Sequence, residues 1–532
     1  MKKYLKKNRA CFIGALIFTF ISSLFAVVLQ FFKGDVLDYA VAGNIKNALK
    51  FAVLLIAFIL GEIGFDFCYK LLFRSKFVTR CTGQLKQDIF QQILEHGYVD
   101  YKKQPQGEYI AKYGSTADAV RDRYFNMLPL FWNILSHVIL VSVALFLLDR
   151  RIALLTIALL TTPLYVPKLI EKRLQKAQED YIKSVESTLA KINDWLSGFE
   201  IIKNFSVERK IMEKFKPAND DSMEKLLSDI RLGAIDQLLA TLISYVSYFI
   251  VLAYAAWLVL KGDFTAGDFF VAIGMIDQLS FPLINLADIT RELIAIEPVC
   301  KEIESFLTAP AEARTGKELK AVTGDISYQN VTFAYDEQTP ILRDFSLKIE
   351  KGKRYLLKGP SGCGKTTAVN LLLRYYNVQS GSIDIDGEPI ERFQSTYGSM
   401  TVVRQEATLF HDTLRNNLTM YRDIPDERLI EVLRRLNLSK YAGNDALDRV
   451  ITENGANLSG GEKKRICLAR ALLRDTDVLI LDEPLANIDS KTAERIEDLL
   501  LSIKEKTMLI VSHQFSENKL NQFERVIDFE KI

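Results

Sequence analysis

The chain has 532 residues, which is long enough for two or more domains, and its formal net charge of +2 gives no indication of a nucleic acid or other highly charged partner. The six cysteines form no C-x-x-C pair and the four histidines are scattered, so neither a disulfide framework nor a zinc site is indicated. Forty-nine per cent of the residues are hydrophobic, and they concentrate in the first 300 positions. This asymmetry predicts a membrane part followed by a soluble part.

Six apolar stretches in the first part approach or exceed the roughly 20 residues that a helix needs to cross a bilayer. The fourth is short and contains Pro163 and Pro167, so a buried core helix is an alternative there. We place the six predicted spans at Cys11–Phe31, Phe51–Phe73, Met127–Leu148, Ile152–Leu169, Ile235–Leu260 and Phe269–Ile289.

The distribution of positive charge predicts the orientation of these spans. The segment MKKYLKKNR before the first span carries five Lys or Arg, and the two long loops, after the second and fourth spans, are also rich in both. The positive-inside rule then places both termini and both long loops in the cytoplasm. No small-residue cleavage site of the A-x-A kind follows the first apolar run, which argues against a cleaved signal peptide.

Three ionisable residues in the second span, Glu62, Asp66 and Lys70, follow one another at four-residue spacing and so share one helix face. One interpretation is an ion pair between Asp66 and Lys70 near the cytoplasmic end. The other is that Glu62, deeper in the membrane, lines a cavity of the helix bundle and favours cations there, because ionisable groups at that depth usually face water or the bundle interior.

Residues 308–325, TAPAEARTGKELKAVTGD, are rich in small and charged residues and read as a linker. It would separate a membrane domain over residues 1–307 from a soluble domain over residues 326–532. In the soluble part, ISYQNVTFAY and GSIDIDGEPI alternate like half-buried strands, whereas RYLLKG, DVLILD and TMLIVSH are continuous apolar runs typical of buried parallel strands. The pattern predicts an α/β nucleotide-binding domain with a small antiparallel sheet.

The stretch GPSGCGKTT, Gly359 to Thr367, satisfies G-x-x-x-x-G-K-[ST] between an apolar strand and an apolar helix. Its glycines allow backbone N–H groups to approach phosphate oxygens. Lys365 can reach the terminal phosphates, and Thr366 can offer its hydroxyl to Mg²⁺. The sequence therefore predicts a phosphate-binding loop.

A second apolar run, DVLILDEP, ends in two carboxylates. Asp482 is suited to holding Mg²⁺ through water, and Glu483 could polarise an attacking water molecule. Such a pair alone is more often a solvated turn, but downstream of a phosphate-binding loop it indicates a hydrolytic site.

The stretch NLSGGEKKR contains a predicted helix start, because Ser459 and Glu462 have the spacing of a capping box. The capping box does not explain Gly460 and Gly461, each of which costs roughly 1 kcal/mol against alanine inside a helix. Two glycines at the positive end of a helix let an anion approach the backbone closely. We therefore expect this helix start to meet an anion.

In chain order, GPSGCGKTT, VVRQEATLF, NLSGGEKKR, VLILDEP, IDS and VSHQ resemble the ATPase domain of ATP-binding cassette (ABC) transporters. With six preceding spans, the whole chain resembles a half-transporter of the exporter-fold type. The resemblance implies a multi-domain fold, an all-α six-helix transmembrane domain followed by an α/β P-loop ABC ATPase domain. It also implies ATP and Mg²⁺ as ligands.

The resemblance assigns roles to individual residues. Tyr335 matches the aromatic residue that stacks on adenine, Asp489 matches the aspartate of a loop that communicates between two cassettes, and the LSGG segment closes over ATP held by a second cassette. The implied catalytic residues are Glu483, His513, Lys365 and Gln405; the implied nucleotide-binding residues are Tyr335, Gly359, Ser361, Gly362, Cys363, Gly364, Lys365, Thr366, Thr367, Ser459, Gly460 and Gly461; the implied metal-binding residues are Thr366, Gln405 and Asp482.

The function implied is ATP-driven transport by a dimer, a homodimer or a heterodimer, embedded in membrane lipid, with no nucleic acid partner. Binding and hydrolysis of ATP would drive alternating access, and export of an unidentified substrate across the cell membrane is the expected direction. An importer with the exporter fold and an ATP-gated sensor or channel are the alternatives. A soluble ABC ATPase of DNA repair or translation does not fit the six spans.

The chain departs from the family pattern in two places. Glu462 stands where many relatives have glutamine, and we expect either residue to cap the helix. The chain also ends soon after His513, whereas relatives usually continue through a glycine-containing turn and terminal helices; this difference bears on a C-terminal dimer contact or regulatory segment and not on the ATP chemistry.

Overall fold

The structure is a computed structural model that describes residues 1–162, 167–309, 316–336, 339–360, 362–486 and 488–530. The chain divides into two compact units. The first unit comprises Met1–Leu94 and Pro105–Ala309, and the second comprises Glu95–Gln104 and Pro310–Ile532. The predicted boundaries at residues 307/308 and 325/326 stay predictions. Within the predicted linker, Leu319 and Val322 are buried in a core of the second unit.

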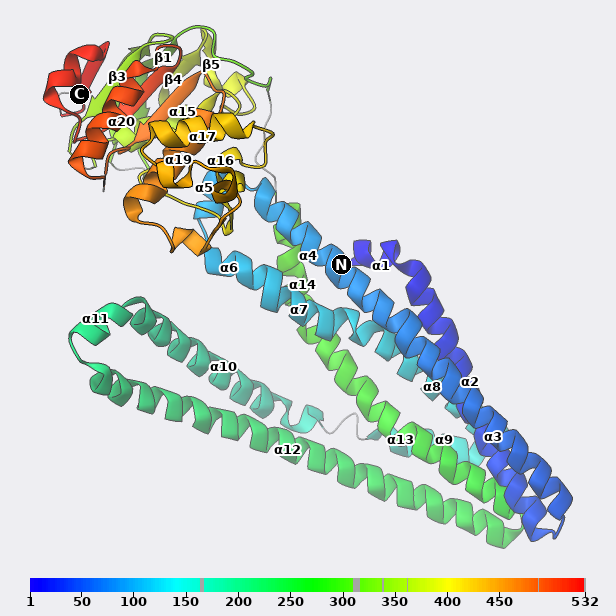
Figure 1. Cartoon of the computed structure of the whole chain (residues 1–532). Coiled ribbons are helices and arrows are strands. Elements are labelled where there is room, and N and C mark those ends of the chain that lie inside the picture. The colour runs from blue at the N-terminus through cyan, green and yellow to red at the C-terminus, as the bar shows by residue number, and fades with distance from the viewer. Residues whose placement is uncertain (163–166, 310–315, 337–338, 361, 487, 531–532) are drawn as a thin grey trace. The chain divides into compact units, whose positions relative to one another are not determined.

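The first unit is helical, and long helices α10 and α12 run side by side in it, joined by α11 (Figure 1). Among the described residues of this unit, three short π-helical segments interrupt the α-helices, namely Tyr69–Arg74, Lys112–Thr116 and Arg121–Phe125. The α-helices are α1 (Lys2–Lys7), α2 (Arg9–Val41), α3 (Ile45–Cys68), α4 (Ser75–Glu95), α6 (Gln106–Ala111), α7 (Ala117–Val120), α8 (Met127–Leu148), α9 (Arg150–Leu160), α10 (Pro167–Ser197), α11 (Phe199–Asn204), α12 (Glu208–Lys261), α13 (Ala266–Ala295) and α14 (Glu297–Thr308).

Within the described residues, five continuous helical stretches are long and apolar enough to cross a membrane. Each contains one of the predicted spans. The fourth predicted span, Ile152–Leu169, includes residues 163–166, which lie outside the described part of the chain, so it stays a prediction. The five stretches are Arg9–Val41, Ile45–Glu95, Gln106–Leu148, Glu208–Lys261 and Ala266–Thr308.

Helices α2 and α3 pack through aromatic side chains and a glycine. Phe25 lies between Phe58 and Phe65, with ring centroids 4.9 and 5.4 Å away. Gly61 lets this contact form, because a Cβ atom there would lie 2.4 Å from the Phe25 ring. The absence of a side chain at this position brings the two helices close together, as is common between membrane helices.

The second unit contains short helix α5 (Tyr98–Lys102) and the α/β region. Its central sheet is parallel, with strand order β11-β3-β10-β9-β6, and a smaller antiparallel sheet has the order β2-β1-β4-β5. Both sheet types were predicted, and both are confirmed. The strands are β1 (Ile326–Phe333), β2 (Leu342–Ile349), β3 (Arg354–Lys358), β4 (Ser380–Ile385), β5 (Glu388–Pro389), β6 (Met400–Val403), β7 (Asp412–Thr413), β8 (Val450–Ile451), β9 (Val478–Asp482), β10 (Thr507–Val511) and β11 (Arg525–Asp528).

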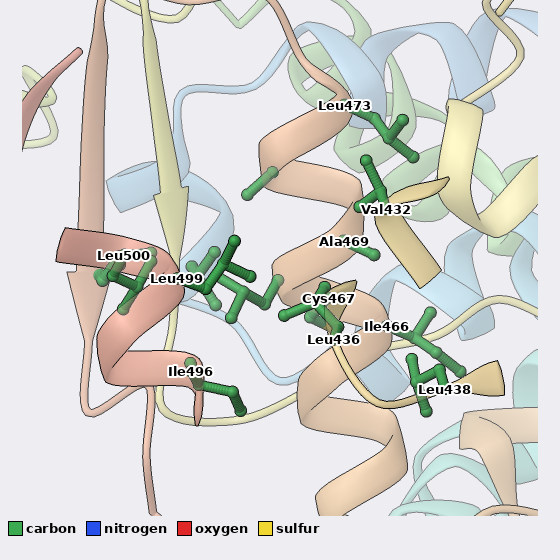
Figure 2. Close-up of a cluster of buried hydrophobic side chains, with 14 of the residues drawn as sticks. Val432, Leu436, Leu438, Ile466, Cys467, Ala469, Leu473, Ile496, Leu499 and Leu500 are labelled. Atoms are coloured by element: carbon green, nitrogen blue, oxygen red, sulfur yellow. The ribbon is translucent and has the colours of Figure 1, made fainter. Parts of the chain in front are cut away.

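Two hydrophobic cores hold the second unit together. In one of them, helices α19 and α20 bury Ile466, Leu499 and Leu500 together with Leu436 from the segment after α17 (Figure 2). Each buried aliphatic side chain of this size stabilises the folded state by roughly 1.5–3 kcal/mol relative to the same side chain in water. The remaining α-helices of this unit are α15 (Lys365–Leu372), α16 (Leu414–Thr419), α17 (Asp426–Arg435), α18 (Asn444–Leu447), α19 (Gly460–Leu473) and α20 (Ser490–Ser502).

Candidate functional site

A cavity of about 540 Å³ lies in the second unit and collects ten of the residues that the sequence singles out. It is lined as well by Ile341, Ala486, Val511 and Gln514. The predicted residues among its lining are Tyr335, Gly362, Gly364, Lys365, Thr366, Thr367, Gln405, Asp482, Glu483 and His513.

The order of the central sheet explains this convergence. Strands β3, β10, β9 and β6 are neighbours and parallel, so their carboxyl ends meet at one edge of the sheet. The phosphate-binding loop follows β3, His513 follows β10, Asp482 ends β9 and Gln405 follows β6. In open α/β sheets this edge is where ligands bind.

The phosphate-binding loop has the backbone that its glycines allow. Gly364 has φ +102° and caps α15, and Gly359 has φ +140°, where a Cβ atom would lie 2.8 Å from the Cys363 sulfur. The Lys365 Nζ donates to the carbonyl oxygens of Gly359 and Pro360, at 2.6 and 2.7 Å, and lies 3.5 Å from the Cys363 Sγ. The ammonium group therefore lies within the loop. Ser361 falls outside the described residues.

Two carboxylates of the site are shielded from water. Burial raises the pKa of Asp482, and the positive charges of Arg404, Lys464 and Lys365 oppose that rise. Burial also raises the pKa of Glu483, whose Oε1 lies 3.7 Å from the Nε2 of His513. A raised pKa brings a carboxylate closer to the basicity that a general base needs near neutral pH.

The site also offers a set of oxygen ligands suited to Mg²⁺. The side chains of Thr366, Gln405 and Asp482 supply a hydroxyl, an amide carbonyl and a carboxylate to the same cavity. Mg²⁺ in proteins is usually held by one or two carboxylates together with substrate phosphates and water. The residues present therefore fit this ion.

Tyr335 lies beside the phosphate-binding helix. Its hydroxyl is 3.2 Å from the Thr367 Oγ1 and accepts a hydrogen bond of 3.4 Å from the Asn370 Nδ2. Its ring meets Phe333 and Tyr376 edge to face, and the residue is 49% exposed. A half-exposed aromatic ring at the mouth of a phosphate site can stack on a base.

The LSGG segment lies elsewhere on the second unit. Ser459 and Gly460 are exposed, and Ser459, Gly460 and Gly461 are not among the residues that line the cavity. The predicted capping box is confirmed, because the Glu462 N–H donates to the Ser459 Oγ at 3.3 Å and the Ser459 N–H donates to the Glu462 Oε2 at 2.8 Å. Asp489 likewise caps α20, accepting from the Thr492 N–H at 2.9 Å.

Two basic residues around the site were missed by the sequence analysis. Arg404 lies 3.8 Å from Asp482 and donates to the Asn370 Oδ1 at 2.7 Å. Lys464 is buried and donates to the carbonyl oxygens of Arg404 and Gln405. In the sequence, Lys464 stands between Lys463 and Arg465 and looks like part of a solvated basic run. Only the tertiary structure shows that it is buried.

In the first unit, a cavity of about 350 Å³ is lined by Glu62 and Asp66 together with Ser22, Ser23, Ala26, Ile63, Asn133 and His137. The predicted ion pair between Asp66 and Lys70 is confirmed at 2.7 Å. The proposal that Glu62 lines the transport cavity and favours cations stays a prediction.

Residues 10–283 match the family described as the ABC transporter transmembrane region, and residues 342–486 match the family described as ABC transporter. The first match alone covers more than half of the chain. Together the two matches follow the predicted order of a membrane part and an ATPase part.

Individual relatives agree with these matches. An "ATP-dependent lipid A-core flippase" of Syntrophus aciditrophicus is 26% identical over 87% of this chain and 78% of its own length. A protein of the same name from Photobacterium profundum is 30% identical over 66% of this chain, which matches 61% of that flippase. The "Multidrug resistance-like ATP-binding protein MdlB" of Buchnera aphidicola subsp. Acyrthosiphon pisum is 28% identical over 83% of this chain and 77% of its own.

Among solved structures, a bacterial Atm1-family ABC exporter with ATP bound has a TM-score of 0.83 at 20% sequence identity. The match covers 98% of this chain and 93% of that exporter. At this identity the likeness concerns the fold, which is that of an exporter-type half-transporter.

Proposed function

The chain belongs to the ABC transporter family and is an ATP-hydrolysing membrane transporter of the exporter type. We propose that it works as a dimer whose two cassettes close on ATP. The observation that carries the proposal is the cavity in which Lys365, Asp482 and Glu483 meet at the sheet edge. It supplies phosphate-binding, metal-binding and basic groups within one site.

The proposed roles follow from the positions of the side chains. Lys365 and the loop N–H groups hold the phosphates, and Tyr335 stacks on the adenine. Glu483 takes the proton from the attacking water, and His513, 3.7 Å from it, lies where it can contact the terminal phosphate. Thr366, Gln405 and Asp482 would hold Mg²⁺, which neutralises the charge that develops on the phosphates.

Two surfaces support a dimer. The exposed LSGG segment begins a helix in which Gly460 and Gly461 present backbone N–H groups that the capping box does not use, and the segment does not line the cavity of its own chain. In the first unit, Phe199, Ile201 and Phe205, on and beside α11, are each more than half exposed. Exposed apolar side chains at a helical turn are suited to a contact with a second subunit.

The substrate proposed is an amphipathic molecule with apolar chains, because relatives carry the names lipid A-core flippase and multidrug resistance-like protein. The proposed location is the cell membrane, with the ATPase unit and both termini in the cytoplasm. The five Lys or Arg of residues 1–9 support this orientation.

The test is substrate flux with purified protein in lipid vesicles. The parent chain should hydrolyse ATP and move a fluorescent lipid or dye across the bilayer in an ATP-dependent way. Glu483→Gln should lower both rates by about 100-fold or more while ATP still binds, because the amide keeps the shape but loses the basicity. Glu494→Gln, an exposed glutamate on α20, is the matched control and should behave like the parent. ATP hydrolysis without any ATP-dependent flux would contradict the transporter proposal.

A further inference from the structure

A row of contacts connects α5 to the metal-binding edge of the ATP site. Tyr98 of α5 stacks on Tyr375, with ring centroids 4.0 Å apart and an interplanar angle of 19°. The guanidinium carbon of Arg404 lies 5.4 Å from the centre of the Tyr375 ring, within the range of a cation–π contact. The same guanidinium lies 3.8 Å from Asp482. All four residues belong to the second unit.

Arg404 also contacts the phosphate-binding helix. Its Nη2 donates to the Asn370 Oδ1 on α15 at 2.7 Å, and Asn370 in turn donates to the Tyr335 hydroxyl at 3.4 Å. One guanidinium thus joins the metal-binding carboxylate, the helix that follows the phosphate loop and an aromatic ring. Arginine suits such a site because its planar group can hydrogen-bond at its edge while its face lies on a ring.

The main chain at Arg404 is held separately from its side chain. The Lys464 Nζ donates to the Arg404 carbonyl oxygen at 3.1 Å and to the Gln405 carbonyl oxygen at 2.6 Å. Lys464 is only 4% exposed. Because this anchor fixes the backbone, a shift of Tyr375 would change the direction of the guanidinium rather than move the whole loop.

Helix α5 is in a position to receive movement. It lies in the sequence between α4 and α6, and both continue into stretches that are apolar and long enough to cross a membrane. A cavity of about 250 Å³ borders the stacked rings and is lined by Tyr98, Asp100, Arg374, Tyr375 and Tyr397 among others. This cavity leaves room for α5 to shift within the second unit.

We propose that Arg404 is a positioning residue that carries displacement of α5 to Asp482, through the stacked rings of Tyr98 and Tyr375. The inference rests on the proposed function, in which Asp482 binds Mg²⁺ during ATP hydrolysis. It adds a route from the first cytoplasmic loop to the metal ligand that does not use the side chain of Gln405. At 3.8 Å the guanidinium attracts the carboxylate by charge and is too far away to hydrogen-bond to it, and Asp482 would hold Mg²⁺ in this orientation.

The experiment is a double-mutant cycle on ATP hydrolysis by the full chain in lipid nanodiscs, with Mg²⁺ titrated at saturating ATP. Arg404→Gln should lower the maximal rate about tenfold without raising the Mg²⁺ concentration that gives half-maximal rate. Tyr98→Leu should lower the maximal rate a few-fold. In the double variant, Tyr98→Leu should not lower the maximal rate further, because Arg404→Gln has already removed the contact between the Tyr375 ring and Asp482.

Matched controls separate this route from general damage. Tyr98→Phe keeps the ring and should retain the parent rate, and Arg404→Lys should recover part of it. Arg343→Gln, an exposed arginine on β2, should combine with Tyr98→Leu by simple multiplication of the rate effects. Binding of a fluorescent ATP analogue checks that each variant is folded.

Multiplicative effects of Tyr98→Leu and Arg404→Gln would overturn the proposal, and so would a Mg²⁺ requirement that rises in Arg404→Gln with an unchanged maximal rate. A parent chain without ATP hydrolysis would instead contradict the proposed function. The two failures are therefore distinguishable.

Discussion

At the residue scale, Tyr335 offers the most direct test of the nucleotide site. Its half-exposed ring lies beside α15, and we propose that adenine stacks on it. Base–aromatic stacking contributes about 1–3 kcal/mol, so Tyr335→Ala should weaken ATP binding about tenfold or more. Tyr335→Trp should largely preserve the affinity, because the flat surface remains. Equilibrium titration with a fluorescent ATP analogue measures both.

Tyr421→Ala is the matched control for this titration, since Tyr421 is also an exposed tyrosine of the second unit, at 69%, and does not line the cavity. It should bind ATP like the parent. An unchanged affinity in Tyr335→Ala would mean that Tyr335 serves only to pack against Phe333 and Tyr376.

Residues of this site differ in whether a local sequence pattern predicts them. The position of Lys365 and Thr366 in the cavity could be predicted, because the spacing of a phosphate loop is local and visible in the sequence. Arg404 and Lys464 could not be predicted, because their partners are distant in the sequence. Arg404 lies near Asp482, 78 residues away. Lys464 donates to the carbonyl oxygens of Gln405 and Arg404, which are 59 and 60 residues away. No local pattern encodes such pairs.

At the element scale, the start of α19 depends on a carboxylate. Burial alone would raise the pKa of Glu462, but hydrogen bonds from Lys440 and Ser459 outweigh that effect and lower the pKa to about 2. Its contribution to stability is thus fully present above the unfolded pKa of about 4.5 and is lost as pH falls toward about 2. Glutamine can still cap the helix but cannot form the ion pair with Lys440.

We therefore expect Glu462→Gln to be less stable than the parent at about pH 6 and the difference in Tm to narrow between about pH 4.5 and about pH 3. Thermal unfolding of the full chain in detergent, followed by fluorescence over this pH range, measures the difference. Glu453 is an exposed glutamate outside the capping box, and Glu453→Gln should have the same Tm as the parent at every pH in this range. A Tm difference for Glu462→Gln that stays constant over the whole acidic range would contradict the role of its charge.

Elements differ in how well sequence patterns predict them. Strands β3, β9 and β10 are short continuous apolar runs bounded by polar residues, and their parallel pairing was predicted correctly. The π-helical segments, such as Tyr69–Arg74, have no such signature, because one extra residue in a helical turn does not change the apolar composition. Helix α5 has no sequence signature either, because it is five residues long and the stacking of Tyr98 on Tyr375 is a contact between distant parts of the chain.

At the scale of the whole molecule, one chain holds one phosphate loop and one LSGG segment, and the latter does not line the cavity. If the segment grips the ATP of a second chain, each site is built from two chains. Lys365 and Glu483 then belong to one half of a site and Ser459 to the other half. Damage to the two halves can be separated or combined by choosing which chain carries it.

This arrangement predicts complementation. Neither a pure dimer of Lys365→Ala/Glu483→Gln nor a pure dimer of Ser459→Arg should hydrolyse ATP, because each has a lesion in both sites. In a mixed dimer all lesions fall in one site, and the other is assembled from undamaged parts. We expect the mixed dimer to recover part of the parent ATPase rate, at most about half. Two different affinity tags allow purification of the mixed species, and recovery no greater than the sum of the pure dimers would count against shared sites.

A structural measurement makes the same prediction directly. Glu483→Gln with ATP and Mg²⁺ should accumulate as a closed dimer, because binding persists while hydrolysis is lost. Each γ-phosphate should then contact the backbone N–H groups of Ser459–Gly461 from the opposite chain, where the helix N-terminus and the missing side chains of the two glycines allow close approach. Ser459→Arg added to Glu483→Gln should prevent closure by placing bulk at the shared phosphate. A closed, ATP-loaded dimer in which this segment faces solvent would show that the glycines of NLSGGEKKR serve another purpose.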